Sequence, residues 1–192
     1  MKVAIIGKGH VGTAIAKGLS GKHEIKFGHR DPKEPVKAAA DWGEVIVLAV
    51  PHSAAAAATK EIGSAADGKT LVDVSNALND RGELAIGFTT SAAEEIQKLL
   101  PKAYVVKAFN TVFATNQSTG KIGKEQLTLF VAGDNAKARQ TVMQLGKDIG
   151  FDSVDAGALK AARYLEPMGM LMINLGFGLG MGTSIGYKLV KT

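Results

Sequence analysis

The chain opens with Met1-Lys-Val-Ala-Ile-Ile-Gly-Lys-Gly-His-Val-Gly12, and this stretch decides the fold. Val3 to Ile6 form an apolar, largely β-branched run, which is too short for a helix and typical of a strand buried on both faces. Thr13 to Leu19, directly after the glycines, have helical character. A strand, a glycine turn and a helix in this order are the context in which GxGxxG indicates a dinucleotide-binding site. The stretch therefore predicts a Rossmann-type site.

Each glycine of this pattern has a predicted role. Gly7 permits a tight turn, Gly9 lets the backbone approach a pyrophosphate, and Gly12 lets the helix pack closely on the strand. The N–H groups at the start of the helix can bind the anion. The alternative is a glycine turn with a structural role only. The residues of this loop that we expect to bind the cofactor are Gly7, Lys8, Gly9, His10, Val11 and Gly12.

The second predicted strand ends in Gly28-His29-Arg30. Sites that prefer NAD place an Asp or Glu near this position, about 20 residues beyond the glycines, to hold the ribose 2′-hydroxyl. Without a carboxylate here a 2′-phosphate can be accommodated, and Arg30 can bind it in a bidentate way. His29 can donate a further hydrogen bond or stack on the adenine. The sequence therefore favours NADP(H), with the alternative that Arg30 pairs on the surface with Asp31 or Glu34.

The composition narrows the class of protein. The 192 residues are 46% hydrophobic and 21% charged, as expected for a globular protein with a full core. Cysteine is absent, which excludes disulfides, thiolate metal sites and thiol catalysis and fits a cytoplasmic location. The first strand begins at Lys2, which leaves no room for a signal peptide. The net charge is +5, but the lysines are scattered, so we expect no nucleic acid as a partner. We also expect no metal and no membrane, because the sequence shows neither a cluster of metal ligands nor an apolar stretch long enough to cross a bilayer.

Strand-like and helix-like segments alternate along the rest of the chain. This pattern predicts an α/β fold with a Rossmann-type, doubly wound, mainly parallel sheet over 1–157, and a helical, glycine-rich segment over 158–192 in one compact unit. The predicted strands are 3–6, 24–27, 44–50, 69–75, 104–109, 128–132 and 151–154. The predicted helices are 13–19, 36–42, 54–62, 92–100, 136–149 and 159–165, with a polar loop at 120–123 and a capping box formed by Ser91 and Glu94.

Candidate ligand-binding residues follow the third predicted strand. Ligands of a doubly wound sheet lie at the carboxyl ends of its strands, so we expect Val50, Pro51 and His52 to flank the cofactor. His52 has two interpretations. It is either a catalytic residue or a residue at the start of a helix with a satisfied hydrogen bond.

Two more polar strand ends are expected at the same edge. Asn76 could position the nicotinamide carboxamide or a substrate carbonyl, because an amide both donates and accepts hydrogen bonds. Its alternative role is an Asx-type turn. Asn110 and Thr111 form a second polar pair that we expect to contact the substrate. Spacing indicates no catalytic triad, no metal-ligand cluster and no buried pair of carboxylates, so the catalytic residues are unknown.

The last part of the chain is apolar almost throughout. From Pro167 to Gly182 it carries five glycines and is too short to cross a membrane. A buried helix that breaks into a glycine loop is the better interpretation. Its apolar character indicates either a cover over the site or a dimer interface.

The chain resembles the NADPH-dependent coenzyme F-420 reductase family, and most closely its short bacterial NADP-binding dinucleotide oxidoreductases. The resemblance extends from end to end. The matching pieces are Gly7-x-Gly9-x-x-Gly12, Gly28-x-Arg30, Ala49-Val-Pro51, Ser91-Ala-Ala-Glu-Glu95, Val105-Val-Lys-Ala-Phe-Asn-Thr111, Asp155-Ala-Gly157-x-Leu159, Arg163, Leu165-Glu166, Gly180-Met-Gly182 and Ile185-Gly-Tyr-Lys-Leu189.

The resemblance implies hydride transfer between NADPH and a deazaflavin, coenzyme F-420, bound at the carboxyl edge of the sheet. It also implies that Arg30 and His29 hold the 2′-phosphate, that Ala49, Val50 and Pro51 line the cofactor, and that the protein is a cytoplasmic homodimer. Three departures affect these implications. The connection between strands two and three is short, and Asn110-Thr111 and Ser75-Asn76-Ala77 differ from the family pattern at the acceptor side.

The predicted activity is therefore that of an NADP-dependent oxidoreductase. The cofactor supplies the hydride, so the protein needs only to align two rings and exclude water. A different small-molecule acceptor, such as a flavin, a quinone or a chelated ferric ion, is the first alternative. The second alternative is a non-catalytic NADPH-binding redox sensor.

Overall fold

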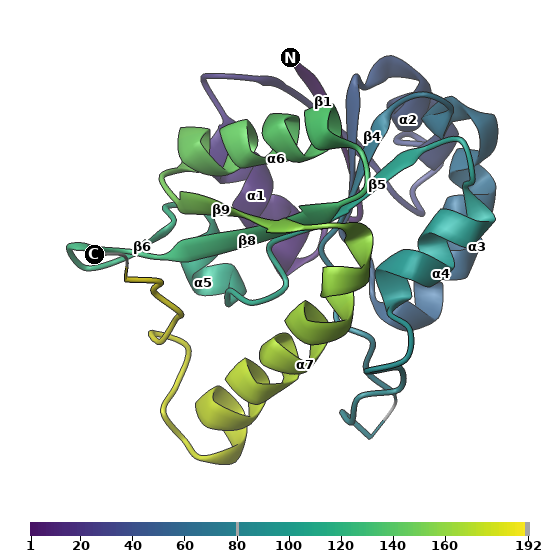
Figure 1. The fold of residues 1–192 in the computed structure, drawn as a ribbon. Coiled ribbons are helices and arrows are strands. Elements are labelled where there is room, and N and C mark those ends of the chain that lie inside the picture. Colours follow the sequence, from purple (N-terminus) through teal and green to yellow (C-terminus); the bar gives the residue numbers. More distant parts are fainter. Residues whose placement is uncertain (80, 191–192) are drawn as a thin grey trace.

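The computed structural model describes residues 1–79 and 81–190. Within them seven strands form one sheet in the order β2-β1-β3-β4-β5-β8-β9 (Figure 1). All neighbouring strands are parallel except β5 and β8, which are antiparallel. The strands are β1 (Lys2–Ile6), β2 (Glu24–Gly28), β3 (Val45–Leu48), β4 (Thr70–Asp73), β5 (Tyr104–Lys107), β8 (Thr128–Gly133) and β9 (Asp152–Gly157). The predicted Rossmann-type, mainly parallel sheet is confirmed.

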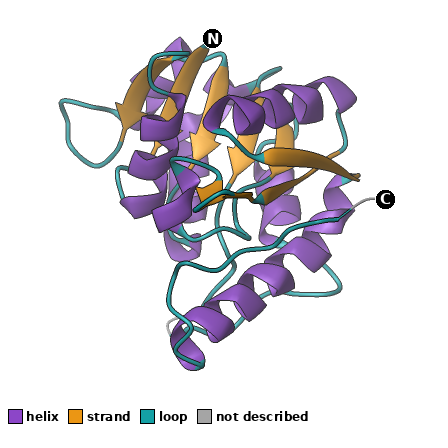
Figure 2. Ribbon diagram, turned by 90° about the vertical axis from the view of Figure 1, so that its left-hand side faces the viewer, coloured by secondary structure: helices purple, strands orange, loops and turns teal. Residues whose placement is uncertain are grey.

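Helices cover both faces of the sheet (Figure 2). They are α1 (His10–Leu19), α2 (Val36–Trp42), α3 (His52–Ile62), α4 (Ala92–Leu99), α5 (Ala114–Gln117), α6 (Ala136–Ile149) and α7 (Ala162–Ile173). Short 3-10 turns span Gly63–Ala66 and Leu159–Ala161, and a π turn spans Asn174–Gly178.

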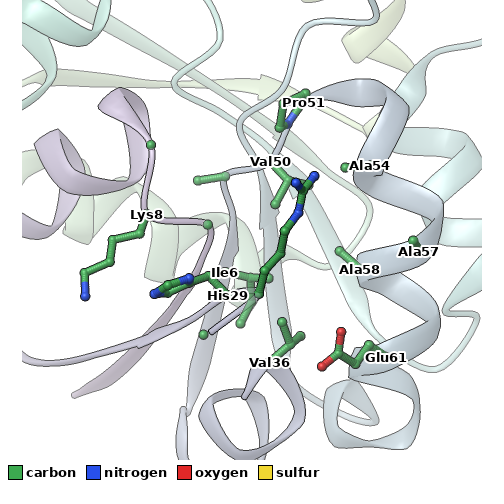
Figure 3. Close-up of a pocket in the computed structure, with 15 residues that line it drawn as sticks. Ile6, Lys8, His29, Val36, Val50, Pro51, Ala54, Ala57, Ala58 and Glu61 are labelled. Atoms are coloured by element: carbon green, nitrogen blue, oxygen red, sulfur yellow. The ribbon is translucent and has the colours of Figure 1, made fainter. Parts of the chain in front are cut away.

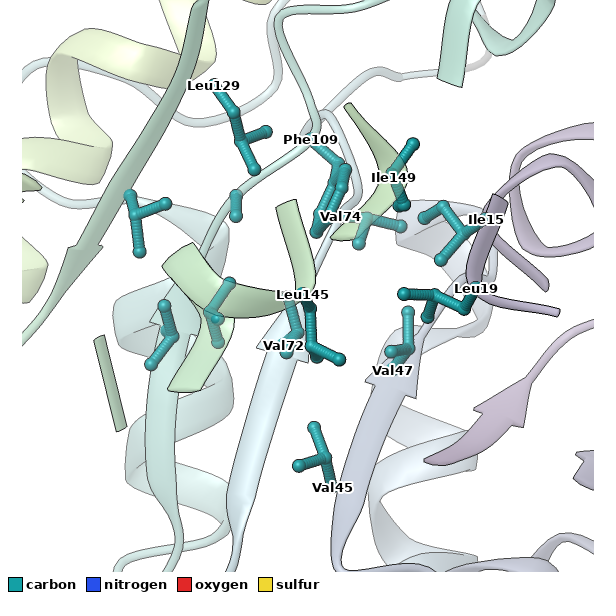
Figure 4. Close-up of a cluster of buried hydrophobic side chains, with 14 of the residues drawn as sticks. Ile15, Leu19, Val45, Val47, Val72, Val74, Phe109, Leu129, Leu145 and Ile149 are labelled. Atoms are coloured by element: carbon teal, nitrogen blue, oxygen red, sulfur yellow. The ribbon is translucent and has the colours of Figure 1, made fainter. Parts of the chain in front are cut away.

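Alternating strand residues build two separate cores. Val45 and Val47 of β3 belong to the cluster under α1 and α6, whereas Ile46 and Leu48 belong to the cluster under α2, α3 and α4. Figure 4 shows the first cluster, in which Val47 packs among side chains of α1 and α6. Because successive residues of a strand point to opposite faces, the uninterrupted apolar sequence of β3 is what a sheet covered on both sides requires.

Most predicted elements are confirmed, because local signals set their ends. The helices α2 and α6 have the predicted bounds. The Asn135 side chain accepts a hydrogen bond from Ala138 N (2.9 Å) at the start of α6. The Ser91 hydroxyl accepts one from Glu94 N (3.2 Å) at the start of α4, as the capping box predicts.

Three predicted segments are corrected. The helix α3 starts at His52 rather than at residue 54, because Pro51 already serves as its N-cap. The loop expected at 120–123 contains β6 (Lys121–Ile122), which pairs with β7 (Glu125–Gln126) in a small hairpin. The last strand of the sheet, β9, extends to Gly157 rather than to residue 154.

The helix of the carboxyl-terminal segment extends beyond residue 165 and is more exposed than predicted. The expected helix over 159–165 continues as α7 through Pro167 to Ile173. The helix is not buried all round, because Tyr164 is 68% exposed and Leu171 50% exposed. Beyond the π turn the chain returns to the sheet, where Tyr187 O accepts a hydrogen bond from Thr128 N (2.9 Å). In the part of the chain that is described, no helix has the length and apolarity that a membrane crossing requires.

Candidate functional site

Two of the three glycines at the junction of β1 and α1 have no room for a side chain. At Gly7, whose φ is +110°, a β-carbon would lie 2.2 Å from the carbonyl oxygen of Ala49. At Gly12 a β-carbon would lie 2.2 Å from the carbonyl oxygen of Gly7. A β-carbon on Gly9 would have no atom within 4 Å. Packing therefore requires two glycines, and the third leaves open space beside the backbone.

The amino-terminal end of α1 is open to an anion. Its N-cap, Gly9, provides no side-chain hydrogen bond, and its first turn carries no acidic residue. The N–H groups of the first turn have no partner within a helix. Together with the positive end of the helix dipole, they suit a phosphate group.

A cavity of about 570 Å³ lies beside this loop. In Figure 3, Lys8 and His29 lie on one side of it and Ala54, Ala57 and Ala58 of α3 on the other. Its lining residues are Ile6, Gly7, Lys8, Gly9, Gly28, His29, Arg30, Val36, Ala49, Val50, Pro51, Ala54, Ala57, Ala58 and Glu61. The structure thus brings together eight of the predicted cofactor residues: Gly7, Lys8, Gly9, His29, Arg30, Ala49, Val50 and Pro51.

The other predicted cofactor residues lie outside this cavity. Val11 and Gly12 belong to α1, and His10 lines a second hollow of about 440 Å³ together with Lys8 and Gly9. His52 is the first residue of α3, and its Nδ1 atom is buried without a hydrogen-bond partner in the described part of the chain. The expectation of a satisfied hydrogen bond for His52 is therefore wrong at that atom.

A carboxylate lies between two basic side chains at one end of the cavity. Glu34 Oε2 lies 2.9 Å from Lys8 Nζ and 2.5 Å from His29 Nε2. The hydrogen bond from Lys8, followed by the one from His29, lowers the pKa of Glu34 against the desolvation of the carboxylate. Arg30 lines the cavity and, among the described residues, forms no ion pair. Glu34 thus pairs with Lys8 and His29 instead of with Arg30, and the loop after β2 brings a carboxylate to a strand end that has none of its own.

The polar strand ends contact one another. Asn110 Nδ2 donates hydrogen bonds to Asn76 Oδ1 (3.0 Å) and to the carbonyl oxygen of Leu165 (2.7 Å). Asn76 Nδ2 donates one to the carbonyl oxygen of Asn110 (3.1 Å). The side chain of Asn76 therefore joins two strand ends rather than closing an Asx turn. Thr111, the next residue, is buried.

The backbone at this edge has an uncommon conformation. Phe109, directly before Asn110, has a φ of +68°, which side chains other than glycine, Asn and Asp rarely adopt. Its ring is buried edge-on against Phe151, and its carbonyl oxygen accepts a hydrogen bond from Gln117 Nε2 (3.0 Å). Packing and hydrogen bonding thus hold the strained residue that aims Asn110.

Beneath the paired asparagines lies a fully buried ionic network that the sequence interpretation missed. Lys107 Nζ contacts Asp73 Oδ2 (2.7 Å) and Glu166 Oε1 (3.0 Å), and all three side chains are 0% exposed. Desolvation opposes the charged ammonium, but the two carboxylates outweigh it, so the pKa of Lys107 is raised. Spacing along the sequence did not indicate these two buried carboxylates, which share one ammonium and so do not form a lone pair. A charged residue inside each of two apolar strands was the available signal, since such residues require buried partners.

Comparisons with known proteins agree with this geometry. No family model matches the chain. The chain is 31% identical over 189 residues to metalloreductase STEAP3 of Rattus norvegicus, but it spans only 37% of that protein's length. It is 28% identical over 210 residues to an F420-dependent NADP reductase of Methanothermobacter marburgensis, with 91% of this chain and 92% of the relative covered.

A solved structure extends the comparison to the whole chain. A protein of Arthrobacter sp. FB24, provisionally described as an F420-dependent NADP-reductase, matches with a TM-score of 0.92 and 30% sequence identity. The match covers 100% of both chains. The chain belongs to the family of the F420-dependent NADP reductases.

Proposed function

We propose that this protein is an oxidoreductase that transfers a hydride between NADP(H) and a flavin-like acceptor such as the deazaflavin coenzyme F-420. The observation that carries the proposal is the cavity beside the glycine loop, with Lys8, His29 and Arg30 at its rim. The names of the full-length relatives support the same cofactor. A second acceptor class, a chelated ferric ion, is supported by the printed name of the metalloreductase relative.

The residues present fit NADP(H). The free N–H groups at the start of α1 would hold the pyrophosphate, and the open space beside Gly9 admits it. The alanines of α3 provide a flat apolar wall for the adenosine. Arg30 would bind the 2′-phosphate, joined by Lys8 and His29 once Glu34 moves aside.

The chain's own contribution to the reaction would be alignment and the exclusion of water. The nicotinamide supplies the hydride chemistry when it is bound. Asn76 and Asn110 lie at the carboxyl ends of β4 and β5, where a doubly wound sheet binds its ligands, and would position the ring and the acceptor. No proton needs to be moved by a side chain if the acceptor is a flavin-like ring, and we therefore assign no catalytic residue.

The carboxyl-terminal segment, residues 158–192, would cover the acceptor side and pair two subunits. The exposed apolar residues of α7 and the following turn support a homodimer. They are Tyr164, Leu171, Phe177, Leu179 and Met181. Apolar side chains in one segment that are 50% exposed or more are typical of an interface.

Binding and turnover test the proposal separately. The first experiment titrates the purified protein with NADPH and NADH and follows the fluorescence of the reduced nicotinamide. We expect NADPH to bind more tightly. The second follows NADPH consumption with deazaflavin, flavin mononucleotide, a quinone and a ferric chelate. Binding without turnover of any acceptor would favour a redox sensor, and absence of NADPH binding would refute the proposal.

A further inference from the structure

The buried network contains two acidic side chains, Asp73 and Glu166, but only one basic side chain, Lys107. Every hydrogen of the Lys107 ammonium has an acceptor: Asp73 Oδ2, Glu166 Oε1 and the carbonyl oxygen of Ser75. The ammonium is therefore fully hydrogen-bonded in its charged form. Its removal from water is compensated only by these three acceptors, because the side chain is 0% exposed.

Both carboxyl groups accept hydrogen bonds at each of their oxygens. Asp73 Oδ1 accepts hydrogen bonds from the backbone N–H and the hydroxyl of Ser75, at 3.0 and 2.7 Å. Glu166 accepts from the backbone N–H groups of Ala92 (3.0 Å) and Ala93 (3.3 Å), at the positive end of α4. Among the described residues, each carboxyl oxygen thus faces at least one donor, an environment that favours the ionised form. Two carboxylates and one ammonium leave a net buried charge of −1.

This charge lies directly behind the paired asparagines. Ser75, whose carbonyl binds Lys107, precedes Asn76, and Leu165, whose carbonyl binds Asn110, precedes Glu166. The network and the asparagine pair therefore form one closed set of contacts that joins β4, β5 and α7. The buried charge is fixed to the edge of the sheet where the nicotinamide is expected.

We propose that the Lys107–Asp73–Glu166 network is a positioning and electrostatic device that favours the oxidised, positively charged nicotinamide and thereby assists hydride release. This inference rests on the proposed function. Hydride transfer moves one proton and two electrons from the dihydronicotinamide to the acceptor, breaks a C–H bond and leaves a positive charge on the nicotinamide ring. A buried net charge of −1 attracts that positive charge, and a low-dielectric site screens the attraction little.

Capping of α4 accounts for an acceptor at Glu166, but the neutral amide oxygen of a glutamine would also accept from Ala92 and Ala93, so capping alone does not require the charge. Apolar residues of similar volume often stabilise a core as well as a buried ion pair does. One ammonium would also be neutralised by a single carboxylate. The second carboxylate adds a desolvation cost that an electrostatic function explains.

The test compares the affinities of NADP⁺ and NADPH rather than the activity. Glu166→Gln and, independently, Asp73→Asn change the net buried charge from −1 to 0. A unit charge about 10 Å away at an effective dielectric of roughly 20 to 40 changes such an equilibrium about 4- to 16-fold. We expect each variant to raise the ratio of the NADP⁺ Kd to the NADPH Kd about fourfold or more, as measured by calorimetry on protein shown to be folded by circular dichroism.

Arg163→Met is the matched control. Arg163 lies on α7 three residues before Glu166 and pairs with Glu94 of α4, away from the strand ends. Its loss should lower stability and leave the ratio of the two Kd values unchanged. Equal weakening of both nucleotides in Glu166→Gln and Asp73→Asn, or an unchanged ratio, would overturn the electrostatic role. Failure of the wild-type protein to bind either nucleotide would instead refute the proposed function.

Discussion

Gly169 of α7 lies so close to Asn76 that a β-carbon at position 169 would come within 2.3 Å of the side-chain oxygen of Asn76. The same β-carbon would lie 3.0 Å from the carbonyl oxygen of Asn110. We expect Gly169→Ala to move α7 away from the asparagine pair and to cost about 1–3 kcal/mol of stability. The kcat of NADPH oxidation should fall more than the affinity for NADPH.

Leu171→Ala is the control for this change, because Leu171 is on the same helix and is half exposed. We expect it to alter the free energy of unfolding by about 0.5 kcal/mol or less. Urea unfolding and steady-state kinetics measure both variants. A Gly169→Ala protein with unchanged kcat would contradict a role for α7 in holding the asparagines.

Arg30→Ala should weaken NADPH while sparing NADH. Arg30 lines the cavity and, in the part of the chain that is described, has no ion-pair partner that would compete with the phosphate for its guanidinium. Loss of a charged hydrogen bond costs about 1.5–3 kcal/mol, which corresponds to a rise of about 10- to 150-fold in the NADPH Kd. Lys33→Ala removes the same charge from the same loop outside the cavity and is the control. Equal loss for both nucleotides would reject the phosphate-binding role.

Gly9→Val and Gly12→Val should fail in different ways. A β-carbon at Gly9 meets no atom within 4 Å, so the valine variant should fold and should block the approach of the pyrophosphate. A β-carbon at Gly12 meets the Gly7 carbonyl oxygen at 2.2 Å, so that variant should be strongly destabilised. Thermal unfolding and NADPH titration distinguish them. A Gly9→Val protein that binds NADPH normally would contradict the proposal that the pyrophosphate binds beside Gly9.

Glu34→Gln should tighten NADPH binding. The neutral amide releases Lys8 and His29, which the carboxylate now holds, so both can turn to the 2′-phosphate. Exposed ion pairs are weak, and we therefore expect a roughly two- to fivefold lower Kd for NADPH. The Kd of NADH, which lacks the 2′-phosphate, is the internal control. A weaker affinity for NADPH would show that Glu34 supports the site instead of competing for it.

The ion pair between α4 and α7 should make stability depend on pH. The hydrogen bond from Arg163 is the largest cause that lowers the pKa of Glu94 below 4.5 in the folded protein, and Ser91 adds to it. A carboxyl with a lowered folded pKa contributes stability above its unfolded pKa, and this contribution is lost as the pH falls through the folded pKa. The stability difference between wild type and Arg163→Met should therefore shrink below about pH 4. Urea unfolding at several pH values measures it, and a constant difference would contradict the assignment.

Local signals predicted most of the fold. The glycines at 7, 9 and 12, the apolar run of β3 and the cap of α4 each act within a few residues, so periodicity and turn chemistry were sufficient. The continuous course of α7 was not predicted: Pro167 in its second turn removes one hydrogen bond without ending the helix. The missed hairpin at β6 and β7 has only two residues in each strand, too few for an alternating pattern.

The candidate site was predicted less completely, because its key contacts join distant parts of the chain. The cavity-lining residues followed from the rule that ligands lie at strand ends. The pairing of Lys107 with Glu166, 59 positions later in the sequence, depends on how α7 docks on β5 and has no periodic signal. The contact between Lys8 and Glu34, 26 positions apart, likewise depends on the tertiary fold and has no periodic signal. Charged residues within apolar strands mark such networks but do not identify their partners.

The carboxylate of Glu34 gives the proposed nucleotide site a tethered counterion. The phosphate of an incoming nucleotide would displace the Glu34 carboxylate from Lys8 and His29. Binding at these two side chains would therefore exchange one anion for another and release fewer salt ions from the protein surface. Electrostatic attraction between a ligand and uncompensated surface cations weakens as ionic strength rises. In this protein the competing attraction of Glu34 for the same cations weakens in parallel. The share of the cofactor affinity that Lys8 and His29 contribute is therefore expected to vary less with ionic strength than the share that Arg30 contributes.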